Sequence, residues 1–279
     1  MVQIGRNYTL RIIDTVDFGV YLDAEELGKV LLPRKYIPSG AGMNDKVAVF
    51  LYLDSEDRPI ATTRMPTAMV GEFAYLEVVD VNDVGAFLDW GLEKDLLVPY
   101  SEQHRPMEAG RSYLVYLSLD KVQGRIVASS KIDKYLDDER PHDFRAGQAV
   151  DLIIANSTDL GFKAIVNHSH FGMLYGTEVF QRLSFGQSIK GFIKHVRPDG
   201  KLDLSLQSGR DALDKHAETI KQYLQNHAGY APLHDKTDPE VIADVLGMSK
   251  AAFKKSIGRL YKLKIIDIEK DGIRLLEEK

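Results

Sequence analysis

One pattern of short segments occurs three times along the 279-residue chain. Its first segment reads DFGVYL at residues 17–22, DVGAFL at 83–88 and DLGFKA at 159–164. Its last segment reads RPIATT at 58–63, GRIVASS at 124–130 and GKLDLSL at 200–206. The spacing between copies is too irregular for a solenoid, so the pattern predicts three tandem domains of one fold, of which the third is the most divergent.

Each copy has the periodicity of β-strands. Apolar residues alternate over runs of five to eight residues, as at Val47, Val49 and Leu51, and Gly, Asp and Asn bound these runs. A glycine at the centre of the second strand of each copy, Gly19, Gly85 or Gly161, fits a sharp bend where a Cβ atom would obstruct the coiling of a small barrel. We therefore expect a five-stranded closed barrel in each copy.

After the third copy the apolar period changes to that of a helix. Leu213, Ile220 and Leu224 form one apolar stripe of a helix that we expect to end near Gly229. Asp238 followed by proline predicts the start of a second helix that stops at Gly247, and Ser249 predicts the cap of a third helix over residues 250–264. A hairpin over residues 265–276 turns at Asp271 and Gly272. This order of elements looks like a winged helix-turn-helix.

The sequence thus predicts a multidomain, mainly β protein with four domains. We expect barrels over residues 1–66, 67–141 and 142–210, and a winged helix over residues 211–279. The formal net charge is −5, but the charge is unevenly distributed. Residues 67–141 contain eight basic and fourteen acidic residues, whereas residues 142–210 contain eight basic and six acidic ones. Since nucleic-acid affinity rests on cations that neutralise phosphates, the second barrel is the least suited to contact phosphate and the third the best suited of the three.

The repeated motifs resemble the S1 RNA-binding domain, an OB-type barrel that binds single-stranded RNA on one face. The resemblance places Phe18 and Tyr21 at the two exposed aromatic positions of that family, where the later copies have Val84 and Phe87, then Leu160 and Lys163. A basic residue opens the last strand of each copy, and the histidine usual after the third strand is replaced by Pro33, Pro99 and Tyr175. The resemblance implies RNA-binding roles for the following residues: Phe18, Tyr21, Arg58, Phe87, Arg125, Phe162, Lys163 and Lys201.

The third predicted helix carries a concentrated positive charge. Residues 249–264 include six lysines or arginines and no acidic residue. Phe253, Ile257 and Leu260 share one face, whereas four lysines fall largely away from it. We therefore also predict nucleic-acid contacts from Lys250, Lys254, Lys255 and Lys262, with simple solvation of the helix or a protein contact as the alternative.

The combination of tandem S1-like barrels with a winged helix that contains GMSKAAFKKSIGRLYK resembles the bacterial conserved virulence factor B family throughout the chain. Membership would imply RNA binding and a role in post-transcriptional control of gene expression. Composition and spacing by themselves say nothing of that regulatory role.

The sequence lacks the motifs of several kinds of catalytic and metal chemistry. The chain has no cysteine, which excludes disulfides and thiolate catalysis, and it has no G-x-x-x-x-G-K-[ST] or H-E-x-x-H motif. His168 and His170 have no evident carboxylate partner for a metal, and Trp90 is interpreted as a residue at the rim of a barrel. No run of 18 apolar residues is present. We therefore expect a cytoplasmic protein that is not an enzyme, has no cofactor or metal and does not enter the membrane.

Two other functions remain open from the sequence. The basic third helix would suit a DNA-binding transcription factor, which would prefer duplex DNA of a defined sequence. The acidic second barrel would suit a protein adaptor that docks on a ribosomal, polymerase or nuclease partner. The leading prediction is an RNA-binding regulator whose partner is single-stranded RNA, with other nucleic acid as the alternative and its protein partners unknown.

Overall fold

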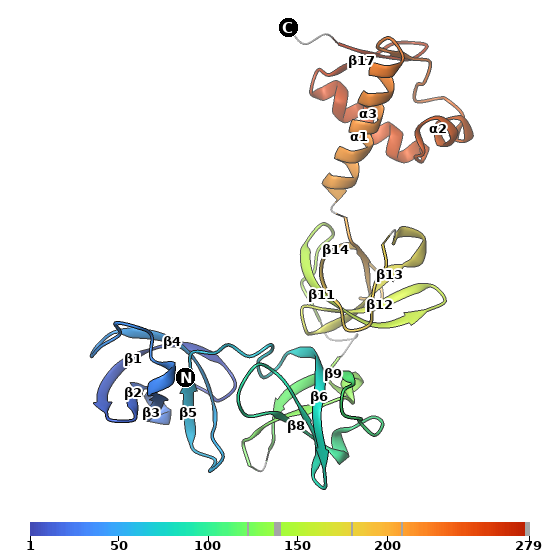
Figure 1. Cartoon of the computed structure of the whole chain (residues 1–279). Coiled ribbons are helices and arrows are strands. Elements are labelled where there is room, and N and C mark those ends of the chain that lie inside the picture. The colour runs from blue at the N-terminus through green and yellow to red at the C-terminus, as the bar shows by residue number, and fades with distance from the viewer. Residues whose placement is uncertain (122, 137–140, 180, 208, 277–279) are drawn as a thin grey trace. The chain divides into compact units, whose positions relative to one another are not determined.

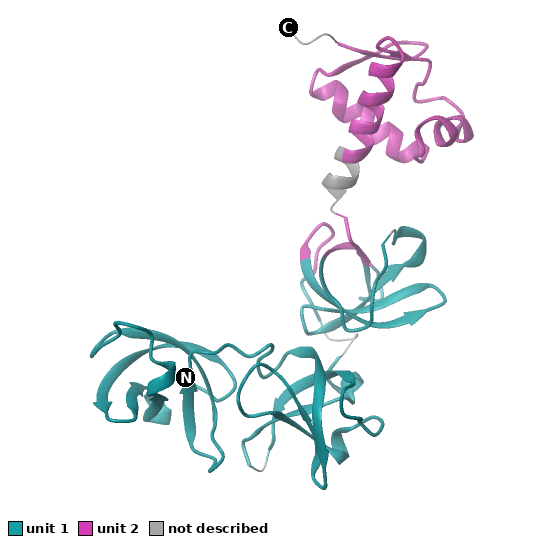
Figure 2. Cartoon of the chain, in the orientation of Figure 1, with its two compact units in different colours: residues 1–143, 150–190, 197–203 teal, residues 144–149, 191–196, 204–279 magenta. Residues whose placement is uncertain are grey.

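The computed structural model describes residues 1–121, 123–136, 141–179, 181–207 and 209–276, of which residues 209–214 are described by their backbone alone. This part of the chain forms three closed five-stranded barrels, a helical segment and a small sheet (Figure 1). The predicted fold class is confirmed. The chain divides into two compact units (Figure 2). One contains residues 1–143, 150–190 and 197–203, and the other contains residues 144–149, 191–196 and 204–279.

The three barrels share one strand order. The first is built from β1 (Asn7–Val16), β2 (Gly19–Asp23), β3 (Lys29–Pro33), β4 (Lys46–Leu53) and β5 (Pro59–Thr62). The second is built from β6 (Phe73–Asn82), β7 (Gly85–Leu88), β8 (Leu96–Pro99), β9 (Ser112–Leu119) and β10 (Ile126–Ser129). The third is built from β11 (Ala149–Thr158), β12 (Gly161–Val166), β13 (His170–Tyr175), β14 (Ser188–Val196) and β15 (Leu202–Ser205). In each barrel the fifth strand lies between the third and the fourth and closes the sheet.

Short 3₁₀ turns connect some of these strands. They are η1 (Glu25–Leu27), η2 (Arg34–Tyr36), η3 (Tyr100–Glu102), η4 (Ile132–Tyr135) and η5 (Gly176–Glu178). In all three barrels the first strand has a register shift close to its middle, between residues 12 and 14, 78 and 80, and 154 and 156. Such a bulge bends and twists its strand, which lets a ten-residue strand coil around a small barrel.

The conserved place of glycine in the repeat has a steric cause. Gly19, Gly85 and Gly161 each begin the second strand of a barrel, rather than lying at its centre. A Cβ atom there would lie between 2.1 and 2.4 Å from a carbonyl oxygen of the third strand. The predicted obstruction is therefore real, but it comes from the close approach of the neighbouring strand.

The first two barrels pack against each other through apolar side chains. Phe50 of β4 is fully buried and belongs to the core cluster of the second barrel. Trp90 meets it edge to face, with ring centroids 5.7 Å apart, and its indole N–H donates to the carbonyl of Lys94 at 2.6 Å. Trp90 is only 3% exposed, so its interpretation as a rim residue is wrong. The first barrel covers this position, which would lie at the rim if the second barrel stood alone.

The histidines of the HSH segment have structural contacts. His168 lies in the turn before β13, where its Nδ1 accepts a hydrogen bond from the amide of Phe73 at 3.0 Å and its ring stacks on that phenyl ring. His170 is buried at the start of β13. Within the described ranges, no group of three His, Asp or Glu side chains is placed to hold a metal ion.

The C-terminal elements have the order expected of a winged helix. They are α1 (Gly209–Asn226), β16 (Tyr230–Ala231), α2 (Pro239–Leu246), α3 (Lys250–Lys262), β17 (Ile266–Ile268) and β18 (Ile273–Leu275). The side chain of Leu213 lies outside the described residues, whereas Ile220 and Leu224 are buried in the core of this segment as predicted. Strand β16, which the sequence analysis missed, pairs with β18. No helix in the described residues is long and apolar enough to cross a bilayer.

Both predicted helix caps are present. The carboxylate of Asp238 accepts a hydrogen bond from the amide of Glu240, and Gly247 ends α2 in the left-handed conformation. The hydroxyl of Ser249 accepts from the amide of Ala252 at the start of α3. These local interactions satisfy amides at the helix starts, which explains why the sequence predicted the boundaries well.

Candidate nucleic-acid interface

Each barrel presents an equivalent face formed by its second, third and fifth strands, the side on which OB-type barrels bind their ligands. The residue before the second-strand glycine projects into solvent in each case: Phe18, Val84 and Leu160 are 58%, 57% and 66% exposed. The strand registers place Tyr21, Phe87 and Lys163 at corresponding positions, opposite Leu31, Leu97 and Met173. We call these surfaces the ligand faces of the three barrels.

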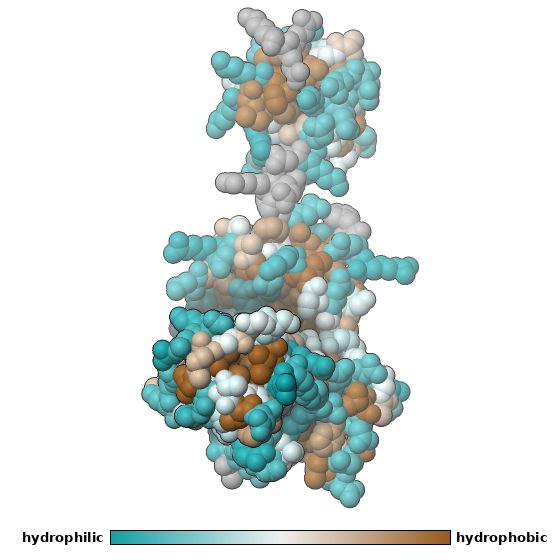
Figure 3. All heavy atoms as spheres, turned by 60° about the vertical axis from the view of Figure 1, so that its left-hand side comes forward, coloured by the Kyte–Doolittle hydropathy of each residue, from teal (hydrophilic) through white to brown (hydrophobic). Residues whose placement is uncertain are grey.

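The ligand face of the first barrel combines two aromatic rings with a neutralised cation. Phe18 is exposed and Tyr21 half-buried, and the forward view in Figure 3 shows hydrophobic surface bordered by hydrophilic side chains on this barrel. Arg58 forms ion pairs of 2.8 Å with both Asp54 and Glu56. The hydrogen bond to Asp54 raises the pKa of the guanidinium, which stays charged, and the two neighbouring carboxylates offset that charge.

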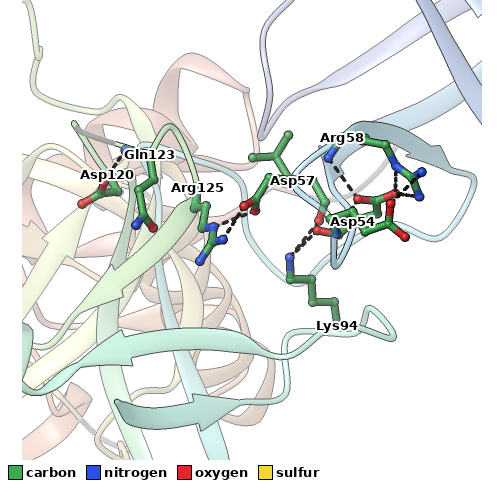
Figure 4. Close-up of polar contacts among 9 residues, drawn as sticks. Asp54, Asp57, Arg58, Lys94, Asp120, Gln123 and Arg125 are labelled. Atoms are coloured by element: carbon green, nitrogen blue, oxygen red, sulfur yellow. Dashed lines mark hydrogen bonds and ion pairs between the residues drawn. The ribbon is translucent and has the colours of Figure 1, made fainter.

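The ligand face of the second barrel lines a cavity of about 400 Å³. Phe87 and Arg125, both predicted to contact RNA, lie along it together with Leu97 and Val127. Arg125 is paired across the junction with Asp57 of the first barrel (Figure 4). The sequence could not indicate this pairing, because 68 residues separate the two side chains.

The ligand face of the third barrel is the most basic of the three. Lys163, Arg197 and Lys201 all line a cavity of about 160 Å³. The ammonium group of Lys163 lies 3.4 Å from the ring centroid of Phe171, in a cation–π contact. Lys201 is 60% exposed and forms an ion pair of 3.6 Å with Asp199. This surface therefore has cations beside aromatic rings, the combination that suits single-stranded nucleic acid.

Arg197 is held in a fixed orientation on this face. Its Nε donates to the carboxylate of Asp203 at 2.9 Å, and its Nη2 donates to the hydroxyl of Tyr175. These contacts hold a planar guanidinium at the edge of the cavity, where its side chain is 37% exposed. Arg197 was not among the residues predicted from the sequence. Its position, three residues before the Gly200 turn and close to Lys201, could have indicated a second cation on this face.

Phe162 is separated from this cluster. It precedes Lys163 on β12, and successive side chains of a strand point to opposite faces. Phe162 is half-buried and does not line the cavity. The structure thus brings Lys163 and Lys201 together and leaves Phe162 apart from them.

The third helix of the C-terminal segment has a buried apolar side and a basic outer side. Phe253, Ser256, Ile257 and Leu260 are buried. Lys254, Lys255 and Lys262 are exposed, and Lys250 is half-buried. Lys254 lies 3.9 Å from Asp235, a solvated pair that holds the lysine only weakly. The basic outer side of α3 consists of these four lysines.

Comparisons with known proteins agree with this architecture. A family model described as the CvfB-like winged helix domain matches residues 218–275, and one described as the S1 domain matches residues 4–64 and 70–131. Both are nucleic-acid-binding types of domain. The fold and these matches define a nucleic-acid-binding protein of tandem S1-type barrels with a winged helix.

Relatives over most of the chain identify the family. The protein YitL of Bacillus subtilis (strain 168) is 31% identical over 276 residues, which cover 92% of this chain and 89% of that protein. Conserved virulence factor B of Staphylococcus epidermidis (strain ATCC 12228) is 27% identical over 251 residues, which cover 85% of this chain and 82% of that protein. The chain belongs to the conserved virulence factor B family.

One solved structure aligns with nearly the whole chain. It is a multidomain protein with nucleic acid binding domains from Streptococcus pneumoniae, with 23% sequence identity, 98% of each chain covered and a TM-score of 0.41.

Proposed function

We propose that this protein binds single-stranded RNA and regulates gene expression after transcription, by binding rather than by catalysis, on transcripts in the cytoplasm. The observation that carries the proposal is the ligand face of the third barrel, where Lys163, Arg197 and Lys201 surround a cavity with aromatic rings. A single strand offers unpaired bases for stacking and flexible phosphates for such cations, whereas a duplex hides its bases.

Two further surfaces support the same function. The first barrel offers Phe18 and Tyr21 as stacking positions, and α3 offers exposed lysines for phosphates. Weak sites on one chain reinforce one another when they bind the same strand, because the first contact raises the effective concentration of the strand at the others. The proposal therefore assigns RNA contacts to several surfaces and requires no fixed arrangement among them.

Fluorescence anisotropy tests this proposal directly. The intact protein is titrated against single-stranded RNA, single-stranded DNA and duplex DNA of equal length at two salt concentrations. We expect RNA to bind most tightly and its affinity to fall with salt. Preference for duplex DNA, or no binding of any of the three, would contradict the proposal. Transcript half-lives in cells that carry the wild-type protein or a variant with a weakened third barrel test the regulatory part.

The basic outer side of α3 favours a second candidate, binding of duplex DNA through the winged helix. Lys254, Lys255 and Lys262 are exposed on the helix that would enter a major groove in this class of domain. If this candidate is correct, the anisotropy titration gives the tightest binding to a duplex, and the loss of these lysines weakens that binding more than it weakens binding to RNA.

A further inference from the structure

The junction of the first two barrels contains a cavity to which the proposed function assigns no RNA contact. Its walls combine apolar and aromatic side chains from the ligand face of the second barrel with residues of β4 from the first. Six of the residues that line it are Tyr52, Val84, Phe87, Leu97, Arg125 and Val127. With a volume of about 400 Å³, it has room for a planar ring against Phe87.

The guanidinium of Arg125, which lines this cavity, is already paired with a carboxylate. The Nε of Arg125 donates to one carboxylate oxygen of Asp57 at 2.6 Å, and its Nη2 donates to the other (Figure 4). Arginine binds a phosphate group with this same two-pronged geometry. The carboxylate of Asp57 therefore lies where a phosphate oxygen pair would bind Arg125.

The turn that carries Asp57 is held in place by its own hydrogen bonds. The carboxylate of Asp54 accepts from the amides of Glu56 and Arg58, at 2.8 and 3.0 Å. Asp57 itself has a φ of 61°, a left-handed conformation that aspartate tolerates better than most residues. Lys94 of the second barrel anchors the turn from the other side by donating to the carbonyl of Asp54 at 2.7 Å (Figure 4).

The ion pair is nevertheless exchangeable. The side chains of Arg125 and Asp57 are 43% and 41% exposed, and solvated pairs of this kind contribute little to stability. The apolar contact between Phe50 and Trp90 holds the two barrels together independently of the pair. The hydrogen bond from Arg125 lowers the pKa of the Asp57 carboxyl, so Asp57 stays ionised at neutral pH.

We propose that the junction cavity is a latent site for one nucleotide of an RNA strand, in which Asp57 takes the place of the phosphate on Arg125. The base would lie against Phe87, and the phosphate would have to displace the carboxylate of Asp57. The inference rests on the proposed RNA binding and adds to it that the first barrel restricts RNA at the second. It also gives a reason why a barrel with a strongly acidic composition keeps an arginine on its ligand face.

The substitution Asp57→Asn in the full-length protein tests the inference. It removes the competing charge and frees Arg125, so one more phosphate contact becomes available to single-stranded RNA. Each such contact steepens the dependence of log affinity on log salt by about 0.7, which makes binding at 0.1 M salt about five-fold tighter relative to 1 M salt. Asp57→Ser should give the same result, and thermal unfolding checks that both variants are folded.

Two sets of control variants separate the site from a general charge effect. Glu108→Gln removes the same charge and frees Arg111, its ion-pair partner at 3.2 Å, at a place outside the cavity and outside the ligand faces. Arg125→Gln alone serves as the reference for a second variant that lacks both charges. The double variant Asp57→Asn with Arg125→Gln should lose the gain in RNA affinity that Asp57→Asn produces.

The outcomes distinguish this inference from the proposed function. If the wild-type protein binds no single-stranded RNA, the proposed function fails. If the wild type binds RNA but Asp57→Asn binds it no more tightly than Glu108→Gln does, or if the gain in affinity persists without Arg125, the latent site is refuted while the proposed function stands. The inference is supported if RNA affinity increases only in the Asp57 variants that retain Arg125.

Discussion

The double substitution Lys163→Gln with Lys201→Gln is the sharpest test of the third barrel. Both lysines line the same cavity. Lys163 contacts an aromatic ring and Lys201 forms an exposed ion pair, and a phosphate can compete with both of these weak contacts. Arg197 is left in place because Asp203 and Tyr175 hold its guanidinium and make it part of the structure of the face. Glutamine keeps much of the length of each side chain while removing its charge.

The expected loss follows from counting phosphate contacts. Two lost contacts on a single strand should make the salt dependence of log affinity shallower by about 1.4, which corresponds to about 25-fold weaker binding at 0.1 M relative to 1 M salt. Removal of Lys201 also leaves the Asp199 carboxylate without its ion-pair partner beside the cavity, so the measured loss should not be smaller than this. Lys201 is exposed and the half-buried Lys163 makes a cation–π contact, so the free energy of unfolding should change by less than about 1 kcal/mol.

The assay is fluorescence anisotropy with one single-stranded RNA over a series of salt concentrations. Lys46→Gln with Lys190→Gln, two exposed lysines on the fourth strands of the first and third barrels, is the matched control for the change of net charge. The control should keep most of the wild-type salt dependence. If the two double variants have equal salt dependence, the third barrel makes no special phosphate contacts and the reasoning from its cavity is wrong.

Three further substitutions test the other surfaces. Phe18→Ala with Tyr21→Ala should weaken binding of single-stranded RNA by about 1–3 kcal/mol for each stacked base without unfolding the barrel; an unchanged anisotropy titration would exclude stacking there. Lys254→Ala with Lys255→Ala should make the salt dependence of RNA binding shallower by about 1.4; a variant that binds like the wild type would mean that these lysines merely solvate α3. Trp90→Ala should destabilise the first two barrels by about 3–5 kcal/mol in urea unfolding, since a buried indole is lost. A change below about 1 kcal/mol would show that the apolar contact at the junction does not hold the barrels together.

The candidate site was only partly accessible from the sequence. The repeat placed Tyr21, Phe87 and Lys163 at corresponding positions, and the strand registers agree with that alignment. Arg197 was missed because its role depends on Asp203 and Tyr175, which reach it from other strands.

The sequence by itself determined the local structure of this protein. The period of its apolar residues defined the strands, and the capping side chains of Asp238 and Ser249 defined the starts of two helices. These features could be predicted because they depend on neighbours within a few residues along the chain. Gly19 and its counterparts could be predicted because their position recurs with the repeat, although the backbone that requires a glycine there belongs to the neighbouring strand.

Only the tertiary structure decided which charges and rings remain available to a ligand. Trp90 is buried because the first barrel covers it, and Arg125 is neutralised by an aspartate 68 residues away. Both outcomes result from packing between separate barrels, which leaves no periodic signal in the sequence. The three ligand faces already differ in sequence, with Tyr21, Phe87 and Lys163 at one position, and the packing of the first barrel against the second then decides that Arg125 is paired.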